Sequence, residues 1–245
     1  MSKIAIFGAT SAIAVATARL WAASGNEFFL YARDVEKLEA VCQDLRTRGA
    51  TKVEFAVSDL SVNADHPALI ERALTALGEI DLVLIAYGTL SNQEACQTNI
   101  ATGLEELNGN FVSVASLCSH LANYLESRGR GTLAVISSVA GDRGRKSNYF
   151  YGAAKGGLSI FLSGLRNRLH SKGISVITLK PGFVDTPMTK DLKKGFLFSS
   201  PQKVAEGIVQ AVARRADVVY LPWFWRYIML VIKHIPEAIF KRLSL

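Results

Sequence analysis

The sequence predicts an α/β fold: a doubly wound parallel sheet with helices on both faces. Seven short apolar runs alternate with longer stretches that can form helices, an order typical of parallel strands joined by right-handed helical crossovers. The runs are apolar at nearly every position, which indicates strands that are buried on both faces. A glycine follows the first run directly, where such a sheet turns into its first helix.

The individual elements follow from these runs and from the residues between them. The expected strands cover residues 4–7, 28–31, 53–57, 82–86, 133–136, 174–179 and 218–221, and the clearest helices cover 12–23, 35–48, 150–170 and 204–215. Ser11 and Asp34 precede the first two helices and are residue types that cap helix N-termini. Pro201 suits the first turn that leads into the helix over 204–215.

Composition favours one globular domain over residues 1–245, with residues 220–245 as an aromatic, apolar C-terminal extension. No interior linker or repeat divides the chain. The net charge of +7 is spread along the sequence, and without a basic cluster we expect no nucleic-acid partner. Cys42, Cys96 and Cys118 are far apart and odd in number, which favours reduced thiols in packing roles over disulfides or a metal site.

The N-terminal apolar run predicts a buried strand. It reaches Gly8 after about five apolar positions, which is too short for the core of an export signal. We therefore expect a cytoplasmic protein.

The turn after the first strand is a candidate phosphate site. Residues 8–14 read GATSAIA, so Gly8 allows a tight turn and Ser11, Ala12 and Ile13 open the helix that follows. Amides at a helix N-terminus attract a pyrophosphate. With a single glycine, an ordinary strand-to-helix turn is the alternative interpretation.

Arg33 follows the second strand, where a side chain meets the adenosine ribose. Its guanidinium can pair with a 2′-phosphate, which favours NADP(H) and leaves NAD(H) as the alternative. A solvated Arg33–Asp34 pair, with Asp34 capping its own helix, explains the same residues without a ligand.

The next two strand ends extend the candidate cofactor site. Asp59 and Leu60 follow the third strand and place a carboxylate near the adenine; Ala86, Tyr87 and Gly88 follow the fourth and form a small turn near the ribose. Acids and glycines also end strands for local reasons, so neither motif identifies a site by itself.

Tyr151 and Lys155 are the strongest candidates for catalysis. They lie four residues apart on the expected helix 150–170 and so share a face. A neighbouring ammonium favours the phenolate and is expected to lower the pKa of the tyrosine, so that it exchanges protons near neutral pH. Ser138, at the end of the fifth strand, can polarise a carbonyl group beside them. Reduction of a carbonyl by hydride from a nicotinamide needs these functions.

From residue 4 to about residue 189 the chain resembles the short-chain dehydrogenase/reductase family, on the motifs just given. The resemblance implies a Rossmann fold, an NAD(P)(H) cofactor, association into dimers or tetramers, and catalysis by Ser138, Tyr151 and Lys155. It also implies that Asn110 holds a water next to the lysine, with Asn108 as the competing assignment. The family's segment that holds the nicotinamide carboxamide is matched by the residues Pro181, Gly182, Val184 and Thr186. The sequence departs from the family in its fewer glycines after the first strand and in Tyr87, where asparagine is usual.

The turn ATSAIA over residues 9–14 and the segment SVAGDRGR over residues 138–145 also resemble a bacterial subgroup that includes the decaprenylphosphoryl-ribose/arabinose ketoreductase. This narrower resemblance implies a keto-sugar on a lipid phosphate, for which Arg143, Arg145 and Lys146 are candidate phosphate contacts. A solvated loop is the simpler interpretation of these charges.

The C-terminal extension contains the run YLPWFWRYIMLVIK over residues 220–233. Pro222 and Arg226 interrupt it, so it is too short to span a bilayer. Packing over the substrate cleft or a subunit is the favoured interpretation, and peripheral contact with a membrane surface is the alternative. Two functions follow as hypotheses: an oxidoreductase acting on a secondary alcohol, such as a sugar hydroxyl, and a catalytically silent dinucleotide-binding protein.

Overall fold

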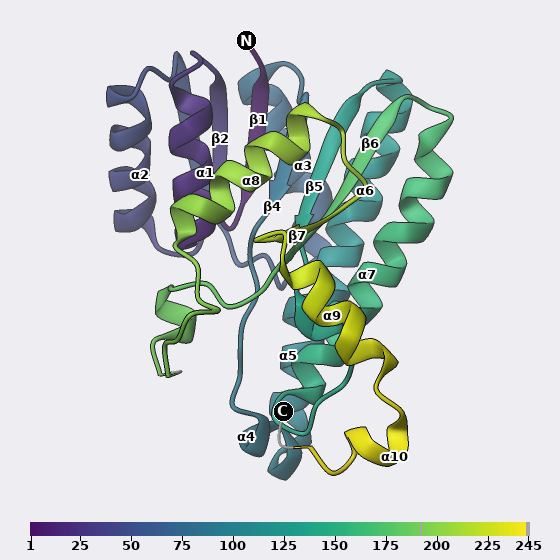
Figure 1. Ribbon diagram of the computed structural model, residues 1–245. Helices are drawn as coiled ribbons and strands as arrows, with labels where there is room; N and C mark the ends of the chain where they lie inside the picture. Colours follow the sequence, from purple (N-terminus) through teal and green to yellow (C-terminus); the bar gives the residue numbers. More distant parts are fainter. Residues whose placement is uncertain (192, 244–245) are drawn as a thin grey trace.

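The computed structural model describes residues 1–191 and 193–243, and within them one parallel sheet of seven strands in the order β3-β2-β1-β4-β5-β6-β7 (Figure 1). The strands are β1 (Lys3–Phe7), β2 (Glu27–Ala32), β3 (Lys52–Val57), β4 (Leu82–Ile85), β5 (Gly131–Ile136), β6 (Ile174–Pro181) and β7 (Val218–Leu221). The order reverses at β1, which pairs with β2 on one side and β4 on the other. The expected doubly wound Rossmann sheet is confirmed.

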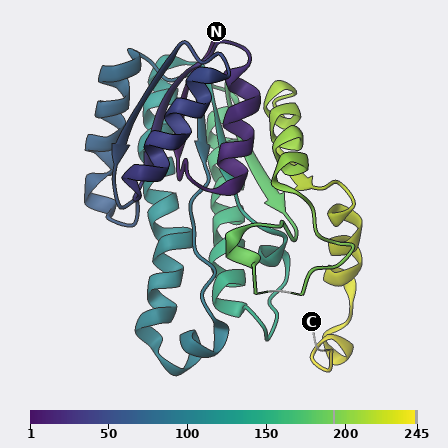
Figure 2. The same ribbon diagram turned by 90° about the vertical axis from the view of Figure 1, so that its left-hand side faces the viewer.

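Helices cover both faces of the sheet, as Figure 2 shows from the side. The helices are α1 (Ala12–Ala22), α2 (Val35–Thr47), α3 (His66–Leu77), α4 (Gln93–Thr98), α5 (Ile100–Leu107), α6 (Ser113–Arg128), α7 (Tyr149–His170), α8 (Pro201–Ala213), α9 (Trp225–His234) and α10 (Glu237–Phe240). Short turns named η1 (Asn63–Asp65), η2 (Asn108–Val112), η3 (Val139–Asp142) and η4 (Pro187–Thr189) lie between them.

The core consists of two main apolar clusters, one on each face of the sheet. In β1, Ile4 and Ile6 belong to the cluster covered by α1, α2 and α8, and Ala5 and Phe7 belong to the cluster covered by α3, α6 and α7. Successive side chains of a strand point to opposite faces, so a strand between two helical layers must be apolar throughout. This is why the expected strands lack alternation.

The expected helices are present with small shifts at their ends. The helix expected over 204–215 begins at Pro201, because Ser200 caps it by accepting a hydrogen bond from Lys203 N (3.3 Å), and it ends at Ala213. The strand expected over 82–86 ends at Ile85, although Ala86 N still donates to Phe7 O (2.8 Å). All three cysteines are buried, as a packing role requires.

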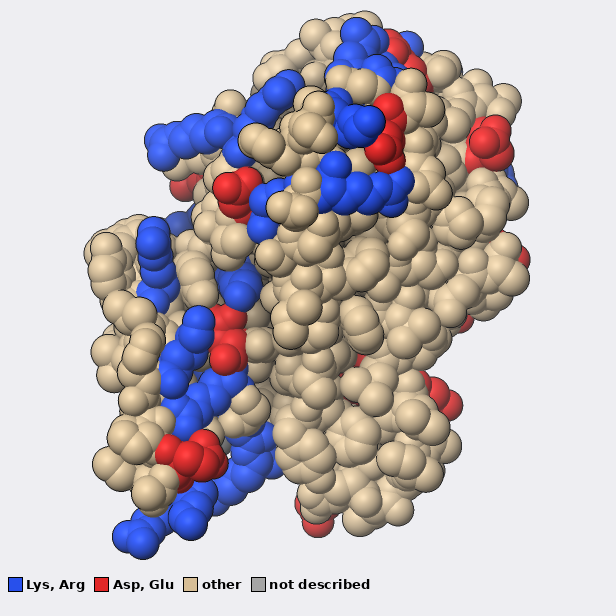
Figure 3. Space-filling view, turned by 90° about the vertical axis from the view of Figure 1, so that its right-hand side faces the viewer, with Lys and Arg blue, Asp and Glu red and all other residues tan. Residues whose placement is uncertain are grey.

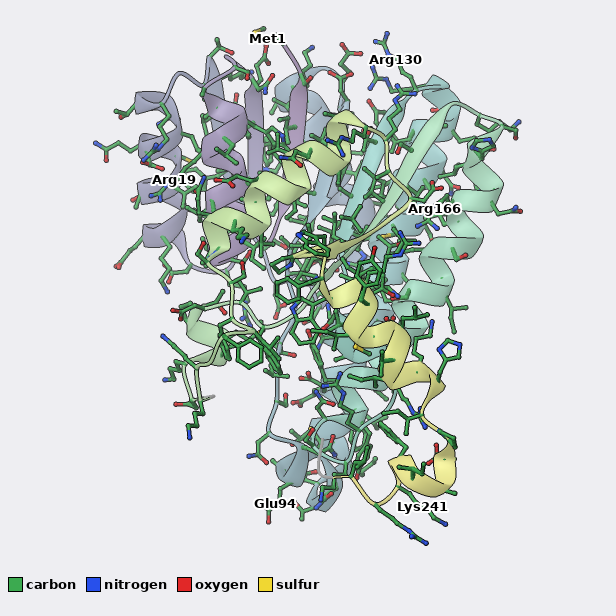
Figure 4. All side chains as sticks on the ribbon, in the orientation of Figure 1. Met1, Arg19, Glu94, Arg130, Arg166 and Lys241 are labelled. Carbon is green, nitrogen blue, oxygen red and sulfur yellow. The ribbon has the colours of Figure 1, made fainter. Side chains whose placement is uncertain are left out.

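The edge of the sheet at β7 is tied to α7 by Arg166, which is labelled in Figure 4. Its guanidinium donates to Val176 O (2.8 Å) and Thr178 Oγ1 (2.6 Å) on β6 and to Asp217 O (2.8 Å) before β7. These bonds align the last strand with the helix that carries Tyr151.

The C-terminal segment lies beside the carboxyl ends of the strands, away from the N-terminus (Figure 1). Trp225 and Met229 on α9 are buried with Val139 in a third, smaller cluster. The inner face of α9 therefore packs against η3, the turn that follows Ser138. None of the helices in the described residues is long and apolar enough to cross a membrane.

Candidate active site

A cavity of about 460 Å³ opens at the carboxyl ends of the strands, where the order of the sheet reverses. Ligands of open α/β sheets bind at such a reversal. The predicted cofactor residues that line it are Gly8, Ser11, Arg33, Asp59, Leu60, Ala86, Tyr87 and Gly88. These residues follow β1 to β4, so the fold gathers positions that are up to 80 residues apart in the chain.

The turn from β1 into α1 requires glycine at position 8. Gly8 has a φ of +87°, and a Cβ atom on it would lie 2.6 Å from the backbone nitrogen of Tyr87. Ser11 then caps α1 by accepting a hydrogen bond from Ala14 N (3.2 Å). The turn therefore lies directly against the end of β4 and points the start of a helix at the cavity, as a pyrophosphate site needs.

Ala12 and Ile13 are not among the residues that line this cavity. Ala12 lines a separate depression together with Pro201 of α8, and Ile13 packs against the apolar cluster on that face. Because α1 packs against α8, the side chains of its first turn are turned away from the cavity. A phosphate contact at these two positions is therefore limited to their backbone.

Arg33 and Asp59 lie together at one end of the cavity. The Asp59 carboxylate accepts hydrogen bonds from the Ser61 backbone (3.0 Å) and hydroxyl (2.8 Å), and these bonds, with a smaller contribution from Arg33, hold its pKa below the usual value. Asp34 accepts from Lys37 N (3.0 Å) and caps α2. The capping interpretation of Asp34 is thus correct, whereas Arg33 remains at the cavity.

Leu60 is buried next to Asp59, and its carbonyl oxygen lies 3.0 Å from Nε2 of the buried His66. Tyr87, which departs from the family pattern, directs its side chain into the core, where its hydroxyl lies 3.2 Å from Ser113 Oγ. The Tyr87 side chain therefore packs under α6. With tyrosine in place of the usual asparagine, it is the backbone of this turn that faces the cavity.

The catalytic candidates on α7 are held by close backbone packing. A Cβ atom on Gly141 in η3 would lie 2.5 Å from the carbonyl carbon of Lys155, and one on Gly152 would lie 3.1 Å from Ala140 O. Small residues on this face of α7 therefore let η3 contact the helix directly. Ser138, the residue before η3, is in this way placed beside Tyr151.

The structure brings Tyr151, Lys155 and Ser138 together. The Ser138 and Tyr151 side chains form a hydrogen bond, and Lys155 Nζ lies 5.8 Å from the centre of the Tyr151 ring. Lys155 is only 3% exposed, and its Nζ donates to Ile136 O (3.3 Å) at the end of β5. The three side chains therefore form one cluster.

Burial dominates the pKa values in this cluster. It raises the pKa of Tyr151 to about 12, although the hydrogen bond from Ser138 acts in the opposite direction. It lowers the pKa of Lys155 to about 8, although the charge of Glu106 acts in the opposite direction. The expectation that Lys155 lowers the pKa of Tyr151 is not met in this structure, because burial disfavours the phenolate and Ser138, not Lys155, is the group that lowers this pKa.

Asn110, and not Asn108, faces Lys155. Asn110 is fully buried in the π-helical turn η2, between α5 and α6, rather than in a regular helix. A Cβ atom on Gly88 would lie 2.5 Å from Asn110 Oδ1 and 3.3 Å from Lys155 Nζ, so these two atoms converge on one point. Asn108 instead lines the 460 Å³ cavity and donates to Ser61 O (3.1 Å).

Three residues next to Asn110 were missed by the sequence analysis: Glu106, Thr89 and Ser91. Glu106 accepts hydrogen bonds from the hydroxyls of Thr89 and Ser91 and from Asn110 Nδ2 (3.0 Å). The only available signal was the spacing of Glu106 and Asn110, four residues apart on an expected helix, and it does not distinguish a buried acid from an exposed one.

The four residues matched to the carboxamide segment, Pro181, Gly182, Val184 and Thr186, do not line the cavity, although Met188 just beyond them does. Gly182 instead lies under the Trp225 indole: a Cβ atom on it would lie 1.9 Å from Trp225 Nε1. Thr186 N–H donates to Thr189 Oγ1 (3.2 Å).

Arg143 is not available for a phosphate. Its guanidinium donates to the carbonyl oxygens of Ile232 (2.7 Å) and Ile235 (2.6 Å) and pairs with Glu237 (2.9 Å). Cations near a helix C-terminus satisfy its free carbonyl groups, and this competes with ligand binding. Arg145 lies against Met229, with its Nη2 3.5 Å from the sulfur. The expected phosphate contact is therefore wrong for Arg143, which anchors α9.

Comparisons with known proteins agree with this geometry. Residues 2–195 match the short chain dehydrogenase family. An uncharacterised oxidoreductase of Mycobacterium tuberculosis is 34% identical over 242 residues, which cover 99% of this chain and 97% of the relative. An uncharacterised oxidoreductase of Streptomyces coelicolor is 31% identical over 98% of this chain and 95% of its own length.

A relative with a named reaction is the 3-oxoacyl-[acyl-carrier-protein] reductase of Chlamydia muridarum. It is 30% identical over 193 residues, which cover 78% of each chain. The family match, these relatives and the cluster of Ser138, Tyr151 and Lys155 at the end of a doubly wound sheet point to one conclusion. The chain is an oxidoreductase that belongs to the short chain dehydrogenase family.

Proposed function

We propose that this enzyme interconverts a secondary alcohol and its ketone with an NAD(P)(H) cofactor, and that Tyr151 donates or accepts the proton. The observation that carries the proposal is the hydrogen bond between Tyr151 and Ser138 beside the buried Lys155. Two hydroxyl donors that converge on one carbonyl oxygen stabilise the negative charge that develops there during reduction.

The residues at the reversal of the sheet fit a dinucleotide. The Gly8 turn leaves no room for a Cβ atom, and the capped start of α1 offers amides to a diphosphate. Asp59 and Leu60 would bind the adenosine, and Tyr87, Gly88 and Lys155 the nicotinamide ribose. When bound, the cofactor supplies or accepts the hydride. Pro181, Gly182, Val184 and Thr186 would close over its far end.

The high pKa of Tyr151 suits reduction of a ketone. At about 12, the phenol keeps its proton at neutral pH and can give it to the oxygen that gains charge. Ser138 orients that oxygen, and the ammonium of Lys155 stabilises the phenolate that forms. Asn110 lies behind Lys155, where its amide oxygen can accept a hydrogen bond from a water that returns the proton.

Arg33 supports a preference for NADP(H) over NAD(H). It lines the adenosine end of the cavity next to Asp59. A guanidinium at this position can bind a 2′-phosphate in bidentate fashion, whereas it gains little from a free ribose hydroxyl.

The test of the proposed reaction compares Tyr151→Phe with the wild type. Cofactor binding is followed by NADPH fluorescence, and turnover is measured with a panel of ketones and keto-sugars. We expect the variant to bind NADPH as the wild type does and to lose turnover by about 1,000-fold or more, in line with removal of a general acid. Equal turnover in the variant would exclude Tyr151 as the acid.

Self-association into a dimer or tetramer is proposed on the basis of exposed apolar side chains on α5 and α7. Ile100, Leu104 and Ile160 are each more than half exposed. Copies of the chain that pack through these helices would cover this surface. Light scattering of Ile160→Glu against the wild type is the test, and a monomer in both would exclude this interface.

Contact with an anionic membrane surface is proposed for the outer face of α9 and the turn just before it. Trp223 (72% exposed), Tyr227 and Val231 are turned away from the core. Exposed Arg226, Lys233, Lys241 and Arg242 lie on the same segment. Figure 3 shows Lys and Arg side chains, with Asp and Glu among them, beside uncharged surface at its lower left. Aromatic side chains with a basic rim suit the interface of an anionic bilayer.

This surface also supports the substrate expected from the narrower resemblance, a keto-sugar on a lipid phosphate, because such a molecule would be delivered at the membrane. We further propose that the whole chain acts as one domain, since α9 packs on η3, which follows Ser138.

The membrane proposal is tested by sedimentation of the protein with phosphatidylglycerol vesicles. A Trp223→Ser/Tyr227→Ser variant is expected to lose binding, and Val62→Ser, which changes an exposed apolar residue elsewhere, is expected to retain it. If the wild-type protein does not sediment with these vesicles, the membrane proposal is excluded.

A further inference from the structure

Glu106 is a buried acid beside the catalytic cluster. It is 2% exposed, near the end of α5, and lies four residues before Asn110. Its Oε2 accepts hydrogen bonds from the hydroxyls of Thr89 (2.6 Å) and Ser91 and from Ser91 N (3.2 Å). Its Oε1 accepts from Asn110 Nδ2 (3.0 Å). Every one of these partners is a donor, which is the environment that a carboxylate anion requires.

The Glu106 carboxylate fixes which way the Asn110 amide points. A carboxylate only accepts hydrogen bonds, so the NH₂ group of Asn110 must face it and the amide oxygen must face the other way. Nδ2 also donates to Glu106 O (3.1 Å) and Thr89 O (3.1 Å), while Oδ1 accepts from Thr89 N (3.2 Å). Oδ1 is thereby turned toward the Gly88 backbone, across from the ammonium of Lys155.

The Glu106 charge also acts on the catalytic cluster through space. It raises the pKa of Lys155 and, as a smaller contribution, that of Tyr151. Within the described part of the chain, no carboxylate lies within 4.0 Å of the Lys155 ammonium, so the influence of Glu106 is not that of a contact ion pair.

We propose that Glu106 is a positioning residue for the reaction: it locks the Asn110 amide with its oxygen toward Lys155 and supplies a buried negative charge behind that amide. The inference rests on the proposed function, because it assigns a role relative to Lys155 and Tyr151. Glu106 does not touch the substrate in this role. It acts through Asn110 and through its field.

The role predicts a shift in the pH dependence of turnover. The titratable groups that face Glu106 are Lys155 and Tyr151 on α7 and Cys96 on α4, and the pKa of Cys96 is raised, chiefly by burial. Removing the charge in Glu106→Gln lowers the pKa of both Lys155 and Tyr151, so the whole profile of kcat against pH moves to lower pH. We expect a shift on the order of 0.5 pH unit and a loss of kcat of about 10-fold or more.

Two variants serve as controls for this experiment. Glu106→Asp keeps the charge and is expected to keep the wild-type pH profile even if kcat falls. Glu94→Gln makes the same chemical change on the exposed side of α4 and is expected to match the wild type in both respects; Glu94 is labelled in Figure 4. A lower kcat in Glu106→Gln without any shift in its pH profile would overturn the inference, since a structural defect alone has that effect.

A measurement on the folded wild type covers the case in which Glu106→Gln does not fold. In the folded wild type, the side-chain NH₂ signals of ¹⁵N-labelled Asn110 are expected to be protected from exchange with solvent, because Nδ2 donates to the buried Glu106 carboxylate. An Asn110 NH₂ group that exchanges as fast as a solvated amide would overturn the inference. If Tyr151→Phe keeps full turnover, the proposed function fails; if only the Glu106 results are negative, the proposed function stands and the positioning role falls.

Discussion

The backbone of Gly141 lies directly against the backbone of Lys155, so that a Cβ atom on Gly141 would lie 2.5 Å from the Lys155 carbonyl carbon. This contact joins η3, which follows Ser138, to the helix of Tyr151. The distance between the Ser138 hydroxyl and the Tyr151 hydroxyl is therefore set by backbone packing rather than by side-chain flexibility.

Gly141→Ala is therefore expected to separate Ser138 from Tyr151. The new methyl group meets backbone atoms, which cannot rotate away, so we expect a loss of about 1–3 kcal/mol of stability and a large loss of kcat. Thermal unfolding and turnover measure the two effects. Gly144→Ala, in the following loop with nothing within 4 Å of the added Cβ, should leave both unchanged. A fully active Gly141→Ala would show that the contact does not set the site.

Lys155 is expected to make stability depend on pH in the alkaline range. Its pKa falls from an ordinary 10.5 to about 8 in the fold. Between these values the unfolded chain still binds the proton that the folded chain has lost, so this residue adds stability as pH rises from about 8 to 10.5. Denaturant unfolding at pH 8 and pH 10 should show a gain on the order of 1–3 kcal/mol in the wild type relative to Lys155→Met. Parallel pH dependence in the two proteins would mean that Lys155 titrates normally.

Arg143 is expected to hold the C-terminal segment in place. It donates to carbonyl groups at the end of α9, and its guanidinium lies 3.7 Å from the centre of the Phe240 ring. Arg143→Ala should expose residues 233–243 to rapid trypsin cleavage while the rest of the chain stays resistant. Arg130→Ala, which removes an exposed cation paired with Glu79, is the control. Unchanged cleavage in Arg143→Ala would show that the inner face of α9 suffices to hold the segment.

Arg33 is expected to select the phosphorylated cofactor. Arg33→Ala should weaken NADPH binding by about 10-fold or more and change NADH binding little, because only the 2′-phosphate loses a charged partner. Fluorescence titration with both cofactors measures the difference. If Arg33→Ala weakened NADPH and NADH binding equally, or weakened neither, Arg33 would not be the residue that selects the phosphorylated cofactor.

The sequence predicted the sheet and most of the site because both depend on local patterns. Continuous apolar runs follow from burial on both faces, and parallel strands place every candidate that follows a strand at the same edge. Helical spacing therefore predicted that Tyr151 lies beside Lys155, and the position of Ser138 after the fifth strand predicted that it lies at the same edge of the sheet. The phosphate contact expected of Arg143 was wrong, because the competing partners, the carbonyl groups of α9, lie about 90 residues further along the chain.

The tertiary structure decided what depends on long-range packing and on desolvation. Only the fold shows that Asn110 and not Asn108 faces Lys155. It also shows that the Tyr87 side chain packs against the core and that Glu106 is buried under Thr89 and Ser91. The direction of the Tyr151 pKa also reversed, since the sequence displays the neighbouring lysine but not the loss of water around the phenol. Helical spacing placed Tyr151 and Lys155 side by side; how deeply they are buried, and therefore how they titrate, was set by the elements that close around them.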